Sequence, residues 1–282
     1  MRIIRAEHLG MCFGVRDAIA LAEKQSKIAP VTIFGELVHN ETVNASLRAR
    51  GIQIQPRLGD VSTATVMITA HGASEQAIAR AKKEGFRVME ATCPLVQSAH
   101  RAIQQLVGAG FHPVIIGQRD HVEVRGMTED LAEFDVVLTE PDVMNLKERS
   151  RFGIAAQTTQ PIERVRRLVE AVGKRFPDSE VRFADTVCQP TKQRQNAAVE
   201  LARQCDVIVV IGGARSNNTR ELAETCRRFC DRVIQVQNAG ELKPHLFYNA
   251  RTVGLTAGTS TPDEVIDAVE KRLYEINRST MT

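Results

Sequence analysis

The stretch Val88-Met89-Glu90-Ala91-Thr92-Cys93-Pro94 runs from a short apolar strand candidate, through a cysteine, into the start of a predicted helix. The same order recurs at residues 183–190, which end in Thr186-Val187-Cys188-Gln189-Pro190. A third cysteine, in Gly10-Met11-Cys12-Phe13-Gly14, also precedes an amphipathic stretch. Each thiol therefore lies at the N-terminus of a predicted helix, where the positive end of the helix dipole favours the thiolate.

Long intervals of sequence separate Cys12, Cys93 and Cys188, which indicates that three lobes meet at one metal site. Three thiolates without an obvious fourth ligand suggest an iron–sulfur cluster that leaves one iron open. An open iron can bind substrate, so we expect an enzyme.

The composition is that of an ordinary globular protein. The 282 residues are enough for two or three compact lobes, and 43% of them are hydrophobic and 25% charged. The formal net charge is only +3, and aromatic residues make up 4% of the chain. Without long basic blocks or stacking platforms, we expect no nucleic-acid partner.

Several features favour the cytoplasm. The six cysteines are scattered rather than arranged as a disulfide framework, which suits a reducing compartment. The N-terminus carries charge where a secretory leader would need a long apolar core. No run approaches the roughly 20 apolar residues of a membrane span, so we expect no membrane association.

Short apolar runs alternate with longer helical periodicities, which is typical of βαβ units and parallel sheets. We predict an α/β fold with a three-lobed (trefoil) arrangement of small, mainly parallel α/β domains around a central cluster site. The cysteine spacing places the lobes at 1–94 (with Cys12 and Cys93), 95–189 (with Cys188 at its end) and 190–282. The strand candidates are Val31–Phe34, Val66–Ala70, Val114–Ile116, Val136–Leu138, Phe152–Ala156, Val207–Ile211, Val233–Val236 and Val253–Thr256. The best-defined boundary is the start of the last helix. This helix should begin around Pro262-Asp263-Glu264, after hydroxyl residues that can cap it.

Polar segments follow the predicted strands, and they are rich in glycine, hydroxyl, amide and imidazole groups. In open α/β sheets, ligands bind outside the carboxyl ends of the strands. Helix N-termini there supply N–H groups that suit phosphate oxygens. A pocket of Ser, Thr, Asn and His side chains without a lysine is expected to bind a small diphosphate. The segments are residues 69–74, 117–123, 156–160, 212–219 and 256–260.

Taken in order, the motifs of this chain resemble those of the 4-hydroxy-3-methylbut-2-enyl diphosphate reductase (IspH/LytB) family. The resemblance covers nearly the whole chain, and the ordered set is far more specific than any single motif. Besides Gly10-Met11-Cys12, the matching motifs are Val38-His39-Asn40, Ala70-His71-Gly72, Ala91-Thr92-Cys93-Pro94, His121-Val122-Glu123-Val124, Gln157-Thr158-Thr159, Ser216-Asn217-Asn218 and Ala257-Gly258-Thr259-Ser260-Thr261-Pro262.

The resemblance implies a trefoil around one 4Fe-4S cluster that is held by Cys12, Cys93 and Cys188 and has an open fourth iron. It implies removal of the substrate hydroxyl with two electrons and two protons, to give isopentenyl and dimethylallyl diphosphate. This is the last step of the methylerythritol phosphate route to isoprenoids. Ferredoxin or flavodoxin would be the electron donor.

The resemblance also implies roles for individual residues. Glu123 would be the proton source, with His121 beside it, and Thr158 would orient the hydroxyl. The substrate would be bound by His39, His71, His121, Thr158, Thr159, Ser216, Asn217, Asn218 and Ser260. These roles are physically reasonable, because hydroxide is a poor leaving group that needs an acid, and protonated imidazole binds a diphosphate.

Other interpretations stay open. Val122 stands where the family often has proline, and Arg215 and Asn217 also depart from the common pattern, so a paralogue with altered substrate remains an alternative. A zinc protein with three cysteines and a histidine is another, although zinc ligands usually come in close pairs. A noncatalytic redox or sensor protein is the third, although its clusters normally have four ligands. We interpret Cys205, Cys226 and Cys230 as structural.

Overall fold

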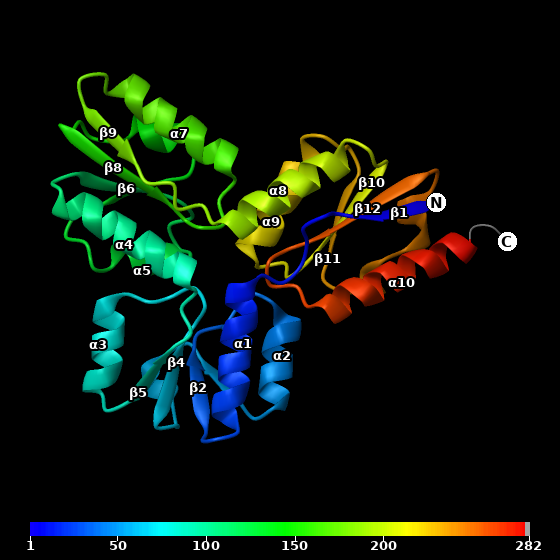
Figure 1. The fold of residues 1–282 in the computed structure, drawn as a ribbon, viewed down its shortest axis with the longest axis horizontal. Helices are drawn as coiled ribbons and strands as arrows, with labels where there is room; N and C mark the ends of the chain where they lie inside the picture. Colours follow the sequence, from blue (N-terminus) through cyan, green and yellow to red (C-terminus); the bar gives the residue numbers. More distant parts are fainter. Residues whose placement is uncertain (280–282) are drawn as a thin grey trace. The chain divides into compact units, whose positions relative to one another are not determined.

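Three four-stranded sheets organise the chain, and all of their strand pairs are parallel (Figure 1). The computed structural model describes residues 1–279. Helices connect many of the strands, because parallel neighbours require a crossover connection. The predicted α/β fold with three small parallel sheets is confirmed.

The first sheet has the strand order β3-β2-β4-β5. Its central strands read as apolar runs because they are buried on both faces. The strands are β2 (Val31–Phe34), β3 (Gln53–Gln55), β4 (Thr65–Ile68) and β5 (Arg87–Glu90), and the accompanying helices are α1 (Phe13–Ser26), α2 (Glu41–Ala49) and α3 (Glu75–Lys83).

The second sheet, of order β7-β6-β8-β9, has a core on each face. Val114 and Ile116 pack with helix α7, whereas Ile115, between them, packs with α4 and α5, as strand alternation requires (Figure 1). The strands are β6 (His112–Ile116), β7 (Asp135–Val137), β8 (Arg151–Ala156) and β9 (Glu180–Phe183). The helices are α4 (Pro94–Gly108), α5 (Val122–Thr128), α6 (Glu140–Met144) and α7 (Ile162–Arg175).

The third sheet has the order β1-β12-β10-β11. Val207 and Val209 pack with helix α10, and Ile208 and Val210 pack with α8 and α9. Helix α10 begins at Asp263, directly after Pro262, which confirms the predicted boundary. The strands are β1 (Arg2–Arg5), β10 (Val207–Ile211), β11 (Val233–Val236) and β12 (Thr252–Ala257), and the helices are α8 (Gln189–Ala202), α9 (Asn217–Arg227) and α10 (Asp263–Ser279).

All three sheets share one connectivity. The sequence had revealed the accompanying strand–cysteine–helix order in only two places. Strands β5, β9 and β1 occupy the same edge position in their sheets, and each is followed by a cysteine, Cys93, Cys188 or Cys12. The third copy is split, because its last strand is supplied by the N-terminus, whereas its other strands lie beyond residue 206. The strand–cysteine–helix repeat is therefore threefold.

The N-terminal strand corrects one expectation. We placed residues 1–94 in the first lobe, but β1 pairs with β12 from Arg2 opposite Thr252 to Arg5 opposite Leu255. Short edge strands such as β1 and β3, with sequences RIIR and QIQ, carry too few apolar residues to be recognised. The lobe boundaries near 94 and 189 stay a prediction.

By contacts, the chain forms two compact units. Among the described residues, the first comprises 1–16, 38–46 and 189–279, and the second comprises 17–37 and 47–188. The second unit therefore contains the first two sheets, whereas residues 38–46, which include the first part of α2, belong to the unit that contains the third sheet.

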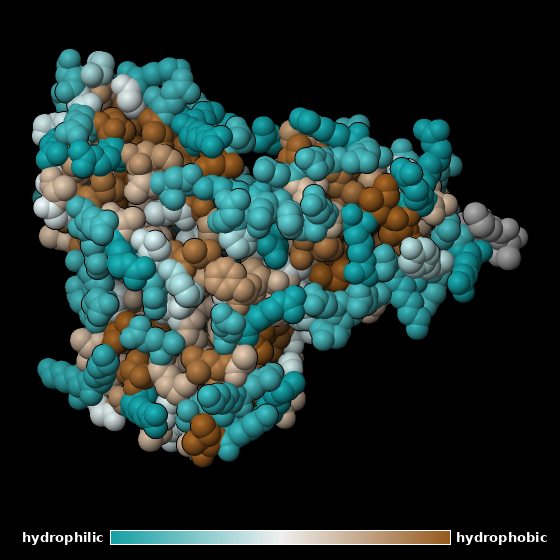
Figure 2. Space-filling view, viewed as in Figure 1, coloured by the Kyte–Doolittle hydropathy of each residue, from teal (hydrophilic) through white to brown (hydrophobic). Residues whose placement is uncertain are grey.

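The face of the molecule shown in Figure 2 is mostly hydrophilic. On the face shown in Figure 2, teal residues cover most of the outer surface, and brown residues appear as separate patches. In the part of the chain that the structure describes, no helix is both long enough and apolar enough to span a bilayer.

Candidate functional site

Each of the three predicted cysteine ligands lies at the start of a helix and is fixed to a loop after the neighbouring strand. Cys93 is the N-cap residue of α4, with Pro94 in the first helical position. Cys188 directly precedes α8, and Cys12 directly precedes α1. Their backbone N–H groups donate to the carbonyl oxygens of Ala70 (3.1 Å), Thr158 (3.0 Å) and Thr259 (3.0 Å), respectively.

The six cysteines, all present as thiols, fall into two environments. Cys12, Cys93 and Cys188 are partly exposed, and so is Cys205. Cys226 and Cys230 are instead buried in the core beneath β10, and burial raises the pKa of Cys226 to about 12 and that of Cys205 to about 11. Thiols that resist ionisation are poor metal ligands. The arrangement is consistent with the structural interpretation of Cys205, Cys226 and Cys230.

Glu123 is a buried acid in the first turn of α5. Its Oε1 accepts the backbone N–H of Thr158 at 2.6 Å. Burial raises the pKa of Glu123 to about 7, although hydrogen bonds from the backbone and side chain of Thr158 oppose the shift. Glu123 can therefore hold or release a proton near neutral pH.

Two histidines lie close together in this second unit. The rings of His71 and His121 meet edge to face, with centroids 5.4 Å apart. His121 is the N-cap residue of α5, and its Nδ1 accepts the N–H of Glu123 at 3.1 Å, which places the proton of a neutral ring on Nε2. Gly72 turns the chain after His71 with φ +78°, and a Cβ there would approach Thr92 to 3.0 Å.

A buried glutamine, Gln157, orders the loop that carries Thr158 and Thr159. Its Oε1 accepts the backbone N–H of Gln118 and the side-chain N–H of Gln160, both at 3.1 Å. Its Nε2 donates to the hydroxyl of Thr159 at 3.2 Å. Gln157 was part of a sequence motif, but its positioning role was not predicted.

The first unit gathers the other predicted binding residues. Ser216 is the N-cap residue of α9, and Asn218 accepts the backbone N–H of Thr259 at 2.9 Å through Oδ1. The buried Oγ of Ser260 has no hydrogen-bond partner within residues 1–279, so it is available to a ligand.

Residues 38–46 belong to this same polar cluster. The carbonyl of His39 lies so close to Gly213 that a Cβ there would come within 2.4 Å of it. Asn40 donates through Nδ2 to the carbonyl of Ser260 at 2.9 Å. Segments that are far apart in the sequence thus place Cys12, His39, Ser216, Asn218 and Ser260 in one unit.

Sequence reasoning missed Arg194, a buried arginine on α8. Its Nε donates to the carbonyl of Gly10 at 2.9 Å, and its Nη1 donates to that of Pro190 at 2.9 Å. Gly10 has φ +73°, and a Cβ there would clash with Ile266 at 2.6 Å. Arg194 therefore holds the turn before Cys12. Charged residues on helices are usually solvated, so the sequence carries no signal for this role.

The three departures from the family pattern are accommodated locally. Val122 and Asn217 occupy the first positions of α5 and α9, and a proline is equally compatible with such a position. Asn217 Oδ1 lies 3.5 Å from the guanidinium of Arg220. Arg215 is exposed and lies 4.0 Å from Glu41.

Comparison with known proteins gives consistent results across the chain. The model of the LytB protein family matches residues 3–274. A relative from Geobacter metallireducens named 4-hydroxy-3-methylbut-2-enyl diphosphate reductase is 35% identical over 280 residues and 98% of each chain. One of the same name from Aquifex aeolicus is 35% identical over 97% of this chain and 96% of its own.

Solved structures agree. The reductase from Plasmodium falciparum, titled E-1-hydroxy-2-methyl-but-2-enyl-4-diphosphate reductase, matches with a TM-score of 0.90 and 26% identity over 96% of this chain and 87% of its own. A second structure, titled as the terminal enzyme of the non-mevalonate pathway, matches with a TM-score of 0.70. It is 34% identical over 98% of this chain and 100% of its own. The chain belongs to the LytB protein family.

Proposed function

We propose that this protein is a 4-hydroxy-3-methylbut-2-enyl diphosphate reductase. The reaction breaks the allylic C–O bond with two electrons and two protons: one proton leaves with the hydroxyl as water, and the other joins the allylic carbon skeleton. The products are isopentenyl and dimethylallyl diphosphate, the end of the methylerythritol phosphate pathway. The family match over residues 3–274 supports this function, and the observation that carries the chemistry is the buried Glu123 with a pKa near 7.

Membership in this family implies an iron–sulfur enzyme. The finer proposal is one 4Fe-4S cluster with Cys12, Cys93 and Cys188 as ligands and an open fourth iron. The donor set fits, since these three thiols are partly exposed, begin helices and are fixed to polar loops. When bound, the cluster supplies the electrons and a Lewis-acidic position for the substrate oxygen.

In this proposal, Glu123 donates the proton that leaves with the substrate hydroxyl. With a pKa raised to about 7, the Glu123 carboxyl group can hold a proton near neutral pH, donate it and then be reprotonated. Thr158 fixes Oε1 through its backbone N–H, which keeps the carboxyl group oriented. His121 accepts the N–H of Glu123 and so ties the imidazole to the acid.

Hydroxyl, amide and imidazole groups bind the diphosphate in this proposal. The Oγ of Ser260 is buried and ready to donate, and the N-terminus of α9 adds the positive end of its helix dipole. His39, His71 and His121 would donate ring N–H groups to the diphosphate, with Thr159, Ser216, Asn217 and Asn218 as further polar partners. Thr158 would orient the substrate hydroxyl.

The electron donor and the compartment are further parts of the proposal. The two electrons require a low-potential carrier, for which ferredoxin or flavodoxin is the class that fits. The scattered cysteines favour a reducing compartment, so we place the protein in the cytoplasm.

Anaerobic purification followed by iron, sulfide and zinc analysis tests the cofactor. We expect close to four irons and four sulfides per chain, and one zinc without sulfide would contradict the cluster. Turnover of 4-hydroxy-3-methylbut-2-enyl diphosphate with a reduced viologen tests the activity. A loaded protein without turnover would favour a sensor or a paralogue.

A further inference from the structure

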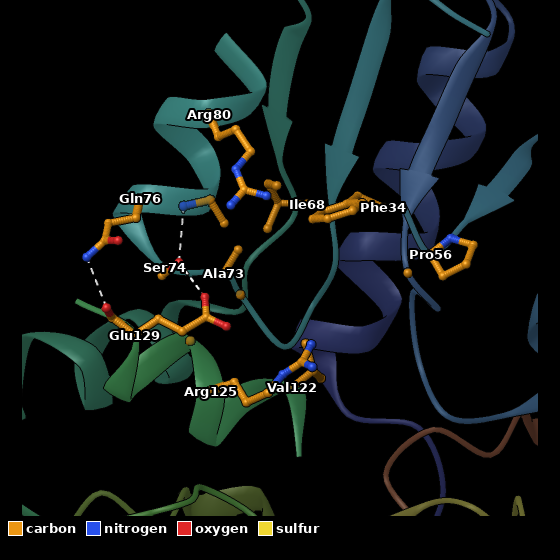
Figure 3. Close-up of a pocket in the computed structure, with 14 residues that line it drawn as sticks. Phe34, Pro56, Ile68, Ala73, Ser74, Gln76, Arg80, Val122, Arg125 and Glu129 are labelled. Carbon is orange, nitrogen blue, oxygen red and sulfur yellow. Dashed lines mark hydrogen bonds between the residues drawn. The ribbon is translucent and has the colours of Figure 1, made fainter. Parts of the chain in front are cut away.

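A cavity of about 370 Å³ lies in the second unit (Figure 3). It adjoins the segments that carry His71, His121 and Glu123, but none of these three residues is part of its lining. Its size is within the range of roughly 300–1,000 Å³ that is usual for small-molecule sites. Phe34, the last residue of β2, and Ile68, the last residue of β4, form part of its wall.

The cavity lies where the connectivity of the first sheet changes direction. In the order β3-β2-β4-β5, the chain passes from β2 to one side and later returns to β4 on the other. Such a switch point leaves a crevice at the carboxyl ends of the two strands, which is the usual place for ligands in open α/β sheets. The location thus favours a binding site independently of the lining chemistry.

Two arginines supply the charge of the cavity. Arg80 comes from α3 and extends toward Ile68, and Arg125 comes from α5 and lies beside Val122 (Figure 3). Within residues 1–279, neither guanidinium has a hydrogen-bond or ion-pair partner. Unpaired guanidinium groups on two facing elements suit phosphate or carboxylate oxygens.

The other polar groups around the cavity are already engaged. Ser74 donates to Glu129 Oε2 at 2.7 Å and accepts the N–H of Ala77 at 3.1 Å, and Gln76 donates to the carbonyl of Glu129 at 3.0 Å. The backbone N–H groups of Glu75 and Gln76, at the start of α3, are taken by Asp130. The two cations outnumber the single Glu129 carboxylate in the lining.

The rest of the wall is largely apolar, and it includes Phe34, Pro56, Ile68 and Val122. Few polar groups are left to recognise a sugar or a base. We propose that this cavity binds an organic phosphate or diphosphate with a short apolar chain, its anionic head at Arg80 and Arg125 and its chain against Phe34 and Ile68.

Calorimetric titration of the anaerobic holoenzyme with geranyl diphosphate tests this. We expect two binding sites per chain. Arg80→Gln and Arg125→Gln should each weaken one site by about tenfold, the usual value of a charge-assisted hydrogen bond. Arg101→Gln, an exposed arginine outside the cavity, is the matched control and should change neither site. His39→Gln should weaken only the other site.

Three outcomes would overturn the proposal: a single site that responds only to His39→Gln, an equal loss with Arg101→Gln, or inorganic diphosphate binding as tightly as geranyl diphosphate. The measurement is binding rather than turnover, so it can fail or succeed separately from the proposed reductase activity.

Discussion

The loops after β8 and β12 occupy the same place in their sheets and make the same contacts, yet they carry different chemistry. Each fixes a cysteine, because the carbonyls of Thr158 and Thr259 accept the N–H groups of Cys188 and Cys12. Each also donates a backbone N–H to the second residue of a helix, from Thr158 to Glu123 on α5 and from Thr259 to Asn218 on α9.

The two helices differ in the side chains that they place at these positions. His121-Val122-Glu123 begins α5 with an imidazole cap and an ionisable acid, whereas Ser216-Asn217-Asn218 begins α9 with a hydroxyl cap and an amide. The same loop-and-helix geometry therefore supplies a proton donor at the start of α5 and neutral hydrogen-bonding groups at the start of α9. Four predictions test this relationship.

The largest effect should come from the anchored thiols. We expect Cys12→Ser and Cys188→Ser to lose iron alike, and turnover to fall by more than about 100-fold, since loss of an outer-shell partner already costs 10–100-fold. Iron and sulfide analysis after anaerobic purification measures this. Cys226→Ser, in the core, is the control and should retain both. A full iron content in the Cys12→Ser or the Cys188→Ser variant would contradict the idea that the two loops hold equivalent ligands.

Glu123→Gln replaces the acid at the start of α5 with an amide, as at the start of α9. The Thr158 N–H keeps an acceptor, so the fold and the iron content should be unchanged, but turnover should fall by at least ~10²-fold because the proton donor is lost. Glu163→Gln, an exposed acid in the first turn of α7, is the matched control. Near-normal turnover of Glu123→Gln would remove Glu123 from its role.

The raised pKa of Glu123 also affects stability. The native state binds this proton up to about pH 7, whereas the unfolded chain releases it around 4.5. Stability should therefore fall by about 3 kcal/mol as the pH rises from 4.5 through 7, a loss absent from Glu123→Gln. Unfolding of the two proteins at a series of pH values measures the difference. If the difference in the free energy of unfolding between the two proteins did not change with pH, the shifted pKa of Glu123 would be contradicted. Above pH 7, turnover should decline along with the protonated fraction.

Asn218→Asp makes the opposite exchange and should have the smallest effect. The Thr259 N–H is still satisfied, but the new charge would repel the diphosphate, so we expect KM to rise about tenfold with a smaller change in kcat. Asn238→Asp, an exposed cap elsewhere, is the control for the added charge. A change in kcat alone would place Asn218 in the chemistry instead.

Much of the fold was readable because central strands are buried on both faces. Runs such as Val207–Ile211 stand out in any sequence, and the helix that begins at Asp263 carries its own start signals. The edge strands β1 and β3 were missed for the opposite reason, since they expose polar residues. The predicted site residues came from motifs, and Arg194 and Gln157 gained roles only through contacts with distant segments.

The sequence by itself determined the buried central strands and the position of three thiols at the starts of helices, because these properties depend on neighbouring residues. Only the tertiary structure decided that β1 completes the third sheet, that Glu123 titrates near pH 7, and that Arg80 and Arg125 share a cavity. Each of these depends on groups far apart in the chain. Thr158, for example, holds the Glu123 carboxylate from 35 residues away.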